Sequence, residues 1–169
     1  PTSEHPTFKY FKAESLQKYA VQYGWKIIND SNRKDMFMDM IRQMDMSYSY
    51  KPVLMKAIML YSDEKGRIKL DDIVAYFRSY YEGRRAAGLP VEKTNSIFAK
   101  GGYTDKEAER NILSNPFKRF EDMQMLRHTK TLCIVQVDEA LWKHLSKEEK
   151  AEIVKICEEK LTQYLSRFK

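Results

Sequence analysis

The sequence has little of what would place it in a specialised structural class. It holds only six glycines and five prolines in 169 residues, which excludes collagen-like chains and Pro/Gly-rich disordered ones. Its two cysteines are too few for a disulfide framework. No apolar run approaches the roughly 20 residues that span a bilayer, and the mean hydropathy is −0.64. We therefore expect a soluble, cytoplasmic protein with no membrane partner.

The beginning of the chain also lacks familiar signals. It opens with Pro1, Thr2 and Ser3, without an initiator methionine and without a basic segment that leads into an apolar one. Such a start is unlike a secretory leader. We interpret the chain as a fragment cut from a longer protein, in which case the activity of the parent lies outside these residues.

Motifs that carry catalysis are absent as well. The sequence has no GxxxxGKS or GxxxxGKT, no GxGxxG, no HExxH and no paired CxxC, and His5, His128 and His144 are far apart. The tripeptide Asp63-Glu64-Lys65 crudely matches the acids and lysine of metal-dependent nucleases, but it is expected on a turn rather than at a buried strand end. We expect no catalytic residue, metal site or cofactor in this chain, which is then not itself an enzyme.

Charge is the property that the sequence has in excess. The net charge is +6, and most of the surplus lies in residues 51–103, which hold ten basic and six acidic side chains. A basic surplus favours phosphate-rich partners, because binding releases the counterions of the phosphates. A solvated surface with interspersed charges is the alternative that charge alone leaves open.

Helical spacing of apolar residues predicts helices at both ends of the chain. One is expected over 13–24 and a second after a cap at Ser31, with an apolar stripe that runs from Met36 through Met40 to Met44. Near the other end, Ser146 opens the last helix with a capping-box pattern.

The middle of the chain alternates between helical and strand periodicity. The expected order is a helix that begins at Pro52, a turn (63–66), a strand (67–70), a helix (70–88), a loop (89–103), two helices (105–115 and 116–124) and two strands (126–131 and 132–137). Cys133 lies in the last strand and is expected in the core. This order is that of a winged helix, a helix-turn-helix variant with a β wing.

We therefore predict an α+β fold, mostly α, in which a winged-helix-like core with a two-stranded β-ribbon carries flanking helices. Residues 1–50 would be an N-terminal helical extension and residues 51–145 the winged-helix-like domain. Residues 146–169 would form a C-terminal helix that packs on that domain.

A winged helix places the helix before the ribbon in the major groove and the turn of the ribbon on phosphates. Most of these contacts would be to the backbone, with little base readout. The nucleic-acid-binding residues predicted on this basis are Arg67, Lys69, Lys106, Arg110, Lys118, Arg119, Arg127, His128 and Lys130.

A second hypothesis stays open beside this one. Glu121 and Asp122 stand next to Lys118 and Arg119, and folds of this kind also serve in protein contacts. The alternative is a protein-interaction or interdomain docking module that has no direct nucleic-acid contact and uses the methionine stripe and exposed aromatic side chains.

Three stretches carry a family resemblance: MDMSYSYKPVLMKAI (44–58), GLPVEKTNSIF (88–98) and SNPFKRFEDMQMLRH (114–128). Over about residues 36–145 the chain resembles the region that follows the motor domains in bacterial superfamily II helicases of the DEAD/DEAH-box or restriction type. The resemblance implies an accessory part of an ATP-dependent enzyme that acts on DNA or RNA. Its partners would be nucleic acid and the motor domains of the parent, and ATP and Mg would bind those domains, since no residue here matches their motifs.

Overall fold

The computed structural model of the protein describes residues 32–168, which form a compact unit from Lys34 onwards. The helix expected over 13–24 and the cap at Ser31 lie outside the described residues. The helices are α3 (Arg33–Arg42), α4 (Tyr50–Tyr61), α5 (Leu70–Ala86), α6 (Ile97–Lys100), α7 (Asp105–Ser114), α8 (Pro116–Asp122), α9 (Glu139–His144) and α10 (Lys147–Leu165). The strands are β1 (Arg67–Lys69), β2 (Leu126–Thr129) and β3 (Ile134–Val137). This mostly helical structure with a small antiparallel sheet confirms the predicted α+β class.

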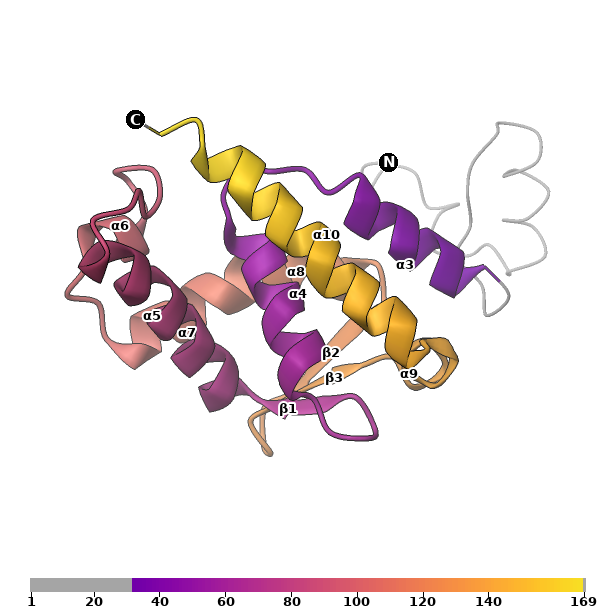
Figure 1. The fold of residues 1–169 in the computed structure, drawn as a ribbon. Coiled ribbons are helices and arrows are strands. Elements are labelled where there is room, and N and C mark those ends of the chain that lie inside the picture. The colour runs from indigo at the N-terminus through magenta and orange to yellow at the C-terminus, as the bar shows by residue number, and fades with distance from the viewer. Residues whose placement is uncertain (1–31, 169) are drawn as a thin grey trace, which may run out of the picture. The chain divides into compact units, whose positions relative to one another are not determined.

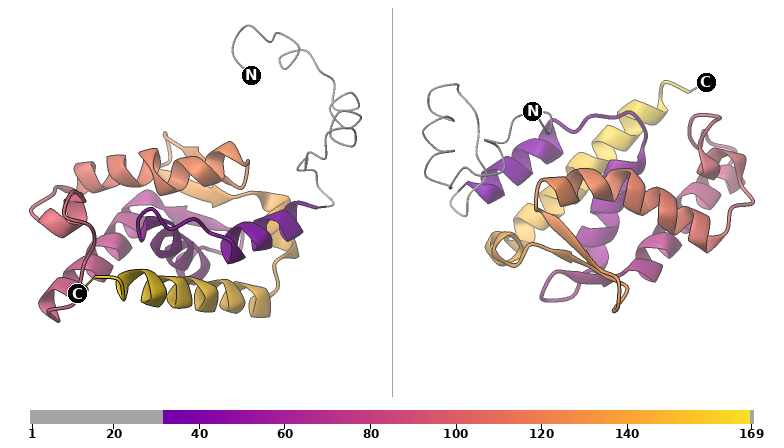
Figure 2. Two further views of the ribbon diagram at one scale, coloured as in Figure 1. Left: turned by 90° about the horizontal axis from the view of Figure 1, so that it is seen from above. Right: turned by 180° about the vertical axis from the view of Figure 1, so that it is seen from behind.

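Helix α4 is the buried helix around which the others pack. Its sequence is apolar on most sides, and the side chains Val53, Leu54, Met55, Ala57 and Ile58 are inaccessible to solvent. Helix α10 lies on one side of α4 and the α7–α8 pair on the other, with α5 beside it (Figure 1, Figure 2). Because α4 is covered from several sides, burial of its side chains supplies a large share of the hydrophobic stabilisation.

Helix α3 lies along α10 (Figure 1). Lys34 Nζ is 2.8 Å from the Glu149 carboxylate, and Arg42 lies 3.5 Å from that of Glu152. The buried side of α3 and of the turn after it consists of Phe37, Met38, Ile41 and Met44. Met36 and Met40 are half-buried, so the predicted methionine stripe is divided between the core and its rim.

The sheet has the strand order β1-β3-β2, and both pairings are antiparallel. The predicted ribbon is therefore extended by β1 as a third strand. The prediction that Cys133 is a core residue on a strand is wrong: β3 begins at Ile134, and Cys133 is exposed with φ +50°. Cys133 belongs instead to the turn that reverses the chain between β2 and β3, where its N–H donates to the Lys130 carbonyl at 3.2 Å.

Polar side chains cap the starts of α7, α9 and α10, and the cap at Ser146 is the one predicted above from the sequence. Thr104 and Ser146 each accept a hydrogen bond from the N–H three residues on, and the glutamate at that position accepts the N–H of the cap in return. Asp138 caps α9 through the Leu141 N–H. These bonds satisfy N–H groups that have no partner within the helix.

A buried carboxylate, Glu92, joins three distant parts of the chain. Its Oε2 accepts the N–H of Ser49 at 2.7 Å and also the Ser49 hydroxyl, while Oε1 accepts the Lys93 N–H at 2.8 Å and the Tyr164 hydroxyl at 2.6 Å. Glu92 is only 7% exposed. Four hydrogen bonds compensate the desolvation of the charge, and they fix the segment after α5 against the start of α4 and the end of α10.

Three buried tyrosines surround this carboxylate. The Tyr81 hydroxyl lies 2.6 Å from Ser49 Oγ, and the Tyr50 hydroxyl is hydrogen-bonded to Ser96. Burial raises the pKa of Tyr50 to about 12, and burial also raises the pKa values of Tyr81 and Tyr164, the last with help from Glu92. The network therefore keeps its phenols protonated around one negative charge.

Three arginines of α5 hold the segment that follows this helix. Arg84 donates to the Pro90 carbonyl, and Arg85 donates to two carbonyls of α6, including that of Phe98. Arg78 forms an ion pair with the first residue of α7. Much of the positive charge in residues 70–86 is therefore engaged by the protein itself.

The tyrosine network predicts a loss of stability in alkali. A folded pKa near 12 for Tyr50 lies above the value of about 10 for an exposed tyrosine, so the folded state retains protons that the unfolded chain releases. The stabilising contribution is complete below pH ~10 and is lost as the pH rises toward 12. Absorbance at 295 nm and far-UV circular dichroism should show these phenols ionising only as the helical signal disappears. Ionisation of all eleven tyrosines with unchanged helicity would contradict the buried network.

Gly66 provides a test of the packing beneath the sheet. It has φ +75°, and a Cβ there would lie 2.7 Å from the ring of Trp142, whose Nε1 donates to the Glu64 carbonyl. We expect Gly66→Ala to lower the free energy of unfolding by about 2 kcal/mol, through strain and overpacking. Gly83→Ala is the matched control, because Gly83 is helical and nothing lies within 4 Å of its added Cβ; we expect it to stabilise by about 0.5 kcal/mol. Urea denaturation measures both, and equal effects would refute this packing.

Candidate nucleic-acid interface

The register of the sheet brings basic side chains from two edge strands onto one surface. Gln136 of β3 is paired with Arg67 of β1 on one side and with Arg127 of β2 on the other. Two residues along β3 toward the β2–β3 turn, Ile134 is paired with Lys69 of β1 and with Thr129 of β2. Side chains of directly paired residues point to the same side of a sheet. These six residues define the outer face of the sheet, on which Arg67, Lys69 and Arg127 are exposed.

Arg67 is oriented by an acidic neighbour. Its Nε lies 2.9 Å from Asp63 Oδ2, while Asp63 Oδ1 accepts the backbone N–H groups of Arg67 and Lys65. The N–H of Arg67 is the main cause of the lowered pKa of the Asp63 carboxyl. Asp63 therefore stays ionised and neutralises part of the charge of Arg67. Its hydrogen bonds to Lys65 and Arg67 explain the position of its carboxylate without a metal ion.

The other basic groups near the outer face have no acidic partner among the described residues. Arg127 Nη2 is 3.5 Å from the Gln136 Oε1, a neutral acceptor. Lys69 and Lys130 are exposed, and Lys130 lies in the β2–β3 turn just beyond the outer face. These three cations are free to meet an external anion.

His128 lies on the opposite side of the sheet from Arg127. Its row contains the buried Val135 and Ile68, and its ring meets Phe117 edge-on with centroids 6.1 Å apart. Since strand side chains alternate between faces, Arg127 and His128 lie on opposite faces of the sheet, although both also border a hollow at its β2 edge.

The remaining predicted residues form a second group on α7 and α8. Lys118 Nζ is 2.7 Å from Asp122 and 3.5 Å from Glu121, and its bond to Asp122 is the main cause of its raised pKa. Lys106, Arg110 and Arg119 are exposed without an ion pair to any described residue. Lys118 is thus bound to acidic residues of its own helix, whereas Lys106, Arg110 and Arg119 are available to an external anion.

A hollow of about 500 Å³ lies beside the edge strand β2. Arg127 and His128 line it together with Glu121, Asp138 and Glu139. Arg127 and Gln136 belong both to this hollow and to the outer face, so the three carboxylates weaken phosphate binding at the β2 edge of that face. The part of the outer face away from the hollow, at Arg67, Lys69 and the turn, is the more favourable for an anion.

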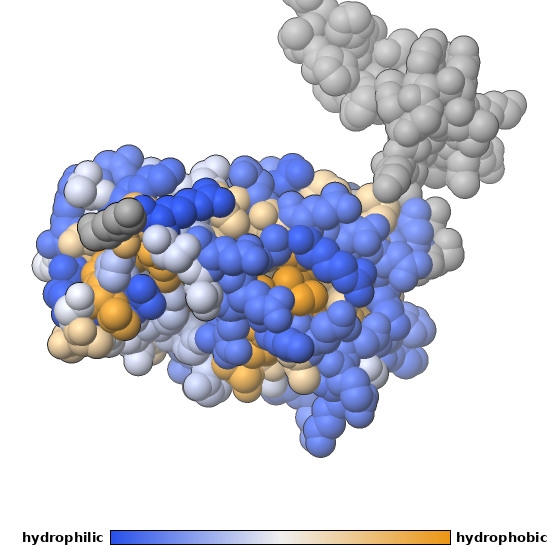
Figure 3. Space-filling model, turned by 45° about the horizontal axis from the view of Figure 1, so that its top comes forward, coloured by the Kyte–Doolittle hydropathy of each residue, from blue (hydrophilic) through white to orange (hydrophobic). Residues whose placement is uncertain are grey.

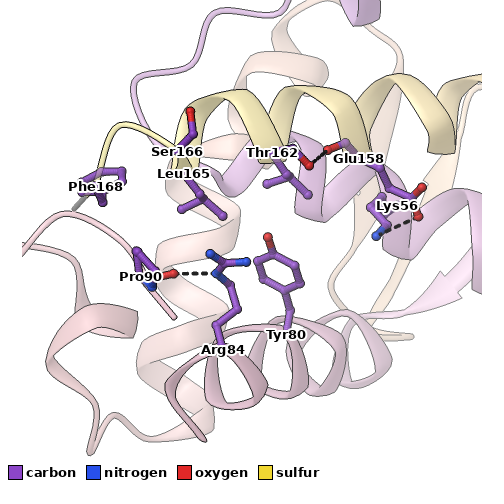
Figure 4. Close-up of a pocket in the computed structure, with 10 residues that line it drawn as sticks. Lys56, Tyr80, Arg84, Pro90, Glu158, Thr162, Leu165, Ser166 and Phe168 are labelled. Atoms are coloured by element: carbon purple, nitrogen blue, oxygen red, sulfur yellow. Dashed lines mark hydrogen bonds and ion pairs between the residues drawn. The ribbon is translucent and has the colours of Figure 1, made fainter. Parts of the chain in front are cut away.

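A larger cleft of about 650 Å³ opens between α5 and α10. Tyr80 and Arg84 rise from α5 toward α10, and Lys56 lies at the far end of the cleft (Figure 4). Lys56 Nζ is 3.3 Å from the Glu158 carboxylate, and Arg84 donates to the Pro90 carbonyl. Because both cations are already bound to protein oxygens, the cleft has little affinity left for an external anion.

Three residues of the outer face, Gln136, Thr129 and Ile134, were not predicted as site residues. Gln136 joins the two arginine-bearing strands, and it is the polar member of the strand Ile-Val-Gln-Val, a pattern that marks an outward position. Thr129 shares the row of Lys69. The alternation of polar and apolar residues can be read from the sequence, but the pairing of the three strands cannot.

Comparison with known proteins finds no family model, curated protein or solved structure that matches this chain. Within residues 32–168, no three or more His, Cys, Asp or Glu side chains are grouped so that they could hold a metal ion. No helix in that part of the chain combines the length and apolarity needed to cross a membrane.

Proposed function

We propose that this chain is a non-catalytic module that binds the phosphate backbone of DNA or RNA through the outer face of its sheet. The observation that carries the proposal is the register that gathers Arg67, Lys69 and Arg127 on one exposed surface, with Lys130 at the adjoining turn. Only Arg67 among these four has an acidic partner within the described residues. The contacts are electrostatic and carry little base specificity.

The order of the elements supports a winged-helix interpretation. Between Tyr50 and Val137 the chain runs α4, β1, α5, then α6, α7 and α8, then β2 and β3, with the sheet order β1-β3-β2. In the view from behind, α7, α8 and the β2–β3 hairpin lie in front of α4 and α10 (Figure 2). In a winged helix this side meets the duplex, so the exposed Lys106, Arg110 and Arg119 form a second group of candidate phosphate contacts, separate from the four cations of the outer face and its turn.

The resemblance of residues 36–145 to the region after helicase motor domains supports a role within a larger enzyme. In this role the module holds the duplex or a separated strand while bacterial DEAD/DEAH-box or restriction-type motor domains, which bind ATP and Mg, act on it. The module needs no cofactor for this task, since positioning by phosphate contacts is sufficient.

The docking alternative has weaker support. Phe37, Ile41 and Met44 of the methionine stripe are buried, so only the half-buried Met36 and Met40 are left for a partner. On the face shown in Figure 3, apolar side chains surface in small groups surrounded by hydrophilic ones. Broad apolar patches are the usual sign of a protein-binding surface, and that face has none among the described residues.

Salt dependence tests the proposed function. Fluorescence anisotropy with labelled duplex DNA and RNA measures the association constant, whose logarithm should fall linearly with the logarithm of the salt concentration. We expect a slope between about −3 and −4, because about four phosphates are neutralised. Between 50 and 200 mM salt the affinity should then fall about 100-fold.

Paired variants locate the surface. The double variant Lys69→Ala/Arg127→Ala should reduce the magnitude of the slope by about 2, one for each lost phosphate contact. The matched control is Lys147→Ala/Lys155→Ala, which removes the same charge from exposed positions on α10. Equal losses for both pairs would contradict the assigned surface, and no binding of folded protein at low salt would refute the function and favour docking.

A further inference from the structure

The two walls of the cleft between α5 and α10 repeat once per helical turn. On α5, Tyr76, Tyr80 and Arg84 follow one another at intervals of four residues. On α10, Glu158 and Thr162 have the same spacing. Residues four apart lie on one side of a helix and rise about 6 Å per step. Tyr80 and Thr162 point into the cleft from opposite walls (Figure 4), so both walls present side chains at the interval of an α-helix.

Exposed apolar side chains extend the cleft at both ends. Of the four large hydrophobic residues that are exposed in the described chain, Leu60 and Tyr61 end α4 and Leu89 follows α5. Leu60 stands one turn beyond the cleft-lining Lys56, and the ring centroids of Tyr61 and Tyr76 are 5.7 Å apart. Leu89 directly precedes a proline that lines the other end. Exposing such side chains forfeits the free energy of burial, so their concentration at one cleft indicates a binding surface.

The charged groups of the cleft are already bound within the protein. Lys56 Nζ is 3.3 Å from the Glu158 carboxylate, and the Arg84 Nε donates to the Pro90 carbonyl. Burial raises the pKa of Tyr80, so its phenol stays neutral. A charged ligand would have to compete with these internal bonds, whereas an apolar surface would pack between them. The ligand that fits this cleft is therefore predominantly apolar where it makes contact.

The two walls run in the same direction along the cleft. On both helices the residue numbers increase from the end at Lys56 and Glu158 toward the end at Pro90 and Phe168 (Figure 4). The C-terminal ends of α5 and α10 therefore lie together, and each carries the partial negative charge of a helix dipole. The positive N-terminal end of a third helix is complementary to this end of the cleft. A helix also has the same side-chain repeat as the walls, so its ridges fit between theirs.

We propose that the cleft between α5 and α10 binds an amphipathic helix of a partner protein, which lies antiparallel to both walls. Its apolar side chains, spaced three and four residues apart, pack against Tyr80 and over the buried Leu161 and Leu165. The wall from Tyr76 to Arg84 is about 12 Å long, so with the exposed side chains at both ends it covers about three turns of the partner. These elements are not those of the outer face, so the inference stands independently of the proposed function.

Peptide selection tests the nature of the ligand. Random peptides of about 15 residues, enough for four helical turns, are displayed on phage and selected on the immobilised full chain of 169 residues. We expect enrichment of sequences with large apolar residues at helical spacing and without internal proline, because proline breaks a helix. Enrichment of proline-rich or otherwise non-helical sequences, or no enrichment, would overturn the proposal.

A pair of neighbouring variants locates the binding site of a selected peptide. Thr162→Arg places a long charged side chain in the cleft from an exposed position on α10, and it should weaken binding by about tenfold or more. Gln163→Arg is the matched control, since it adds the same charge at the next exposed position, which borders a different hollow. Circular dichroism should show that both variants fold. Equal losses of affinity, or no loss from Thr162→Arg, would overturn the assigned cleft.

A nitroxide label on the selected peptide tests its orientation. At the N-terminus of the peptide the label should broaden amide signals near Leu89, and at the C-terminus those near Tyr61. The reverse pattern would contradict the antiparallel arrangement. A chain that binds the helical peptide but no nucleic acid would refute the proposed function alone, whereas a chain that binds nucleic acid but selects no helix would refute this inference alone.

Discussion

The antiparallel register of β3 with its two neighbours is the constraint on which the proposed interface depends. Gln136 lies between Arg67 and Arg127, and Val135 between Ile68 and His128. Because side chains alternate along a strand, a slip of one residue would move the arginines to the core and the apolar residues to solvent. Burial of Ile68 and Val135 therefore fixes the register and, with it, the basic outer face.

The body of the protein determines which cations reach that face. Residues 51–103 hold most of the excess charge, but Arg78, Arg84 and Arg85 are bound to acceptors in the segment that follows α5. The buried Glu92 holds the same segment from the other side. What remains for a partner is a smaller set of cations than composition indicates, and it includes those of the sheet, its turn and the α7–α8 pair.

Local features of the sequence predicted most of the order of elements, because caps and apolar spacing act over a few residues. The short helix α6 in the expected loop 89–103 was missed, and β3 begins at Ile134 rather than at residue 132. The Glu92 network could not be predicted, since it joins Ser49 to Tyr164 across most of the described chain. Cys133 was misplaced because the apolar run 132–137 does not reveal where a hairpin turns. Likewise, the sequence could not show how the predicted site residues divide between the two faces of the sheet and the α7–α8 pair, because that division depends on strand pairing at long range.

The most direct measurement of the central claim is an NMR titration of isotope-labelled protein with short duplex DNA. The account predicts that amide signals of β1, β3, β2 and the turn at residues 130–133 shift first, with α7 and α8 next to them. Signals that line the cleft between α5 and α10 should stay unchanged. Shifts confined to that cleft, or no shifts at low salt, would contradict the assignment of the outer face as a nucleic-acid-binding surface.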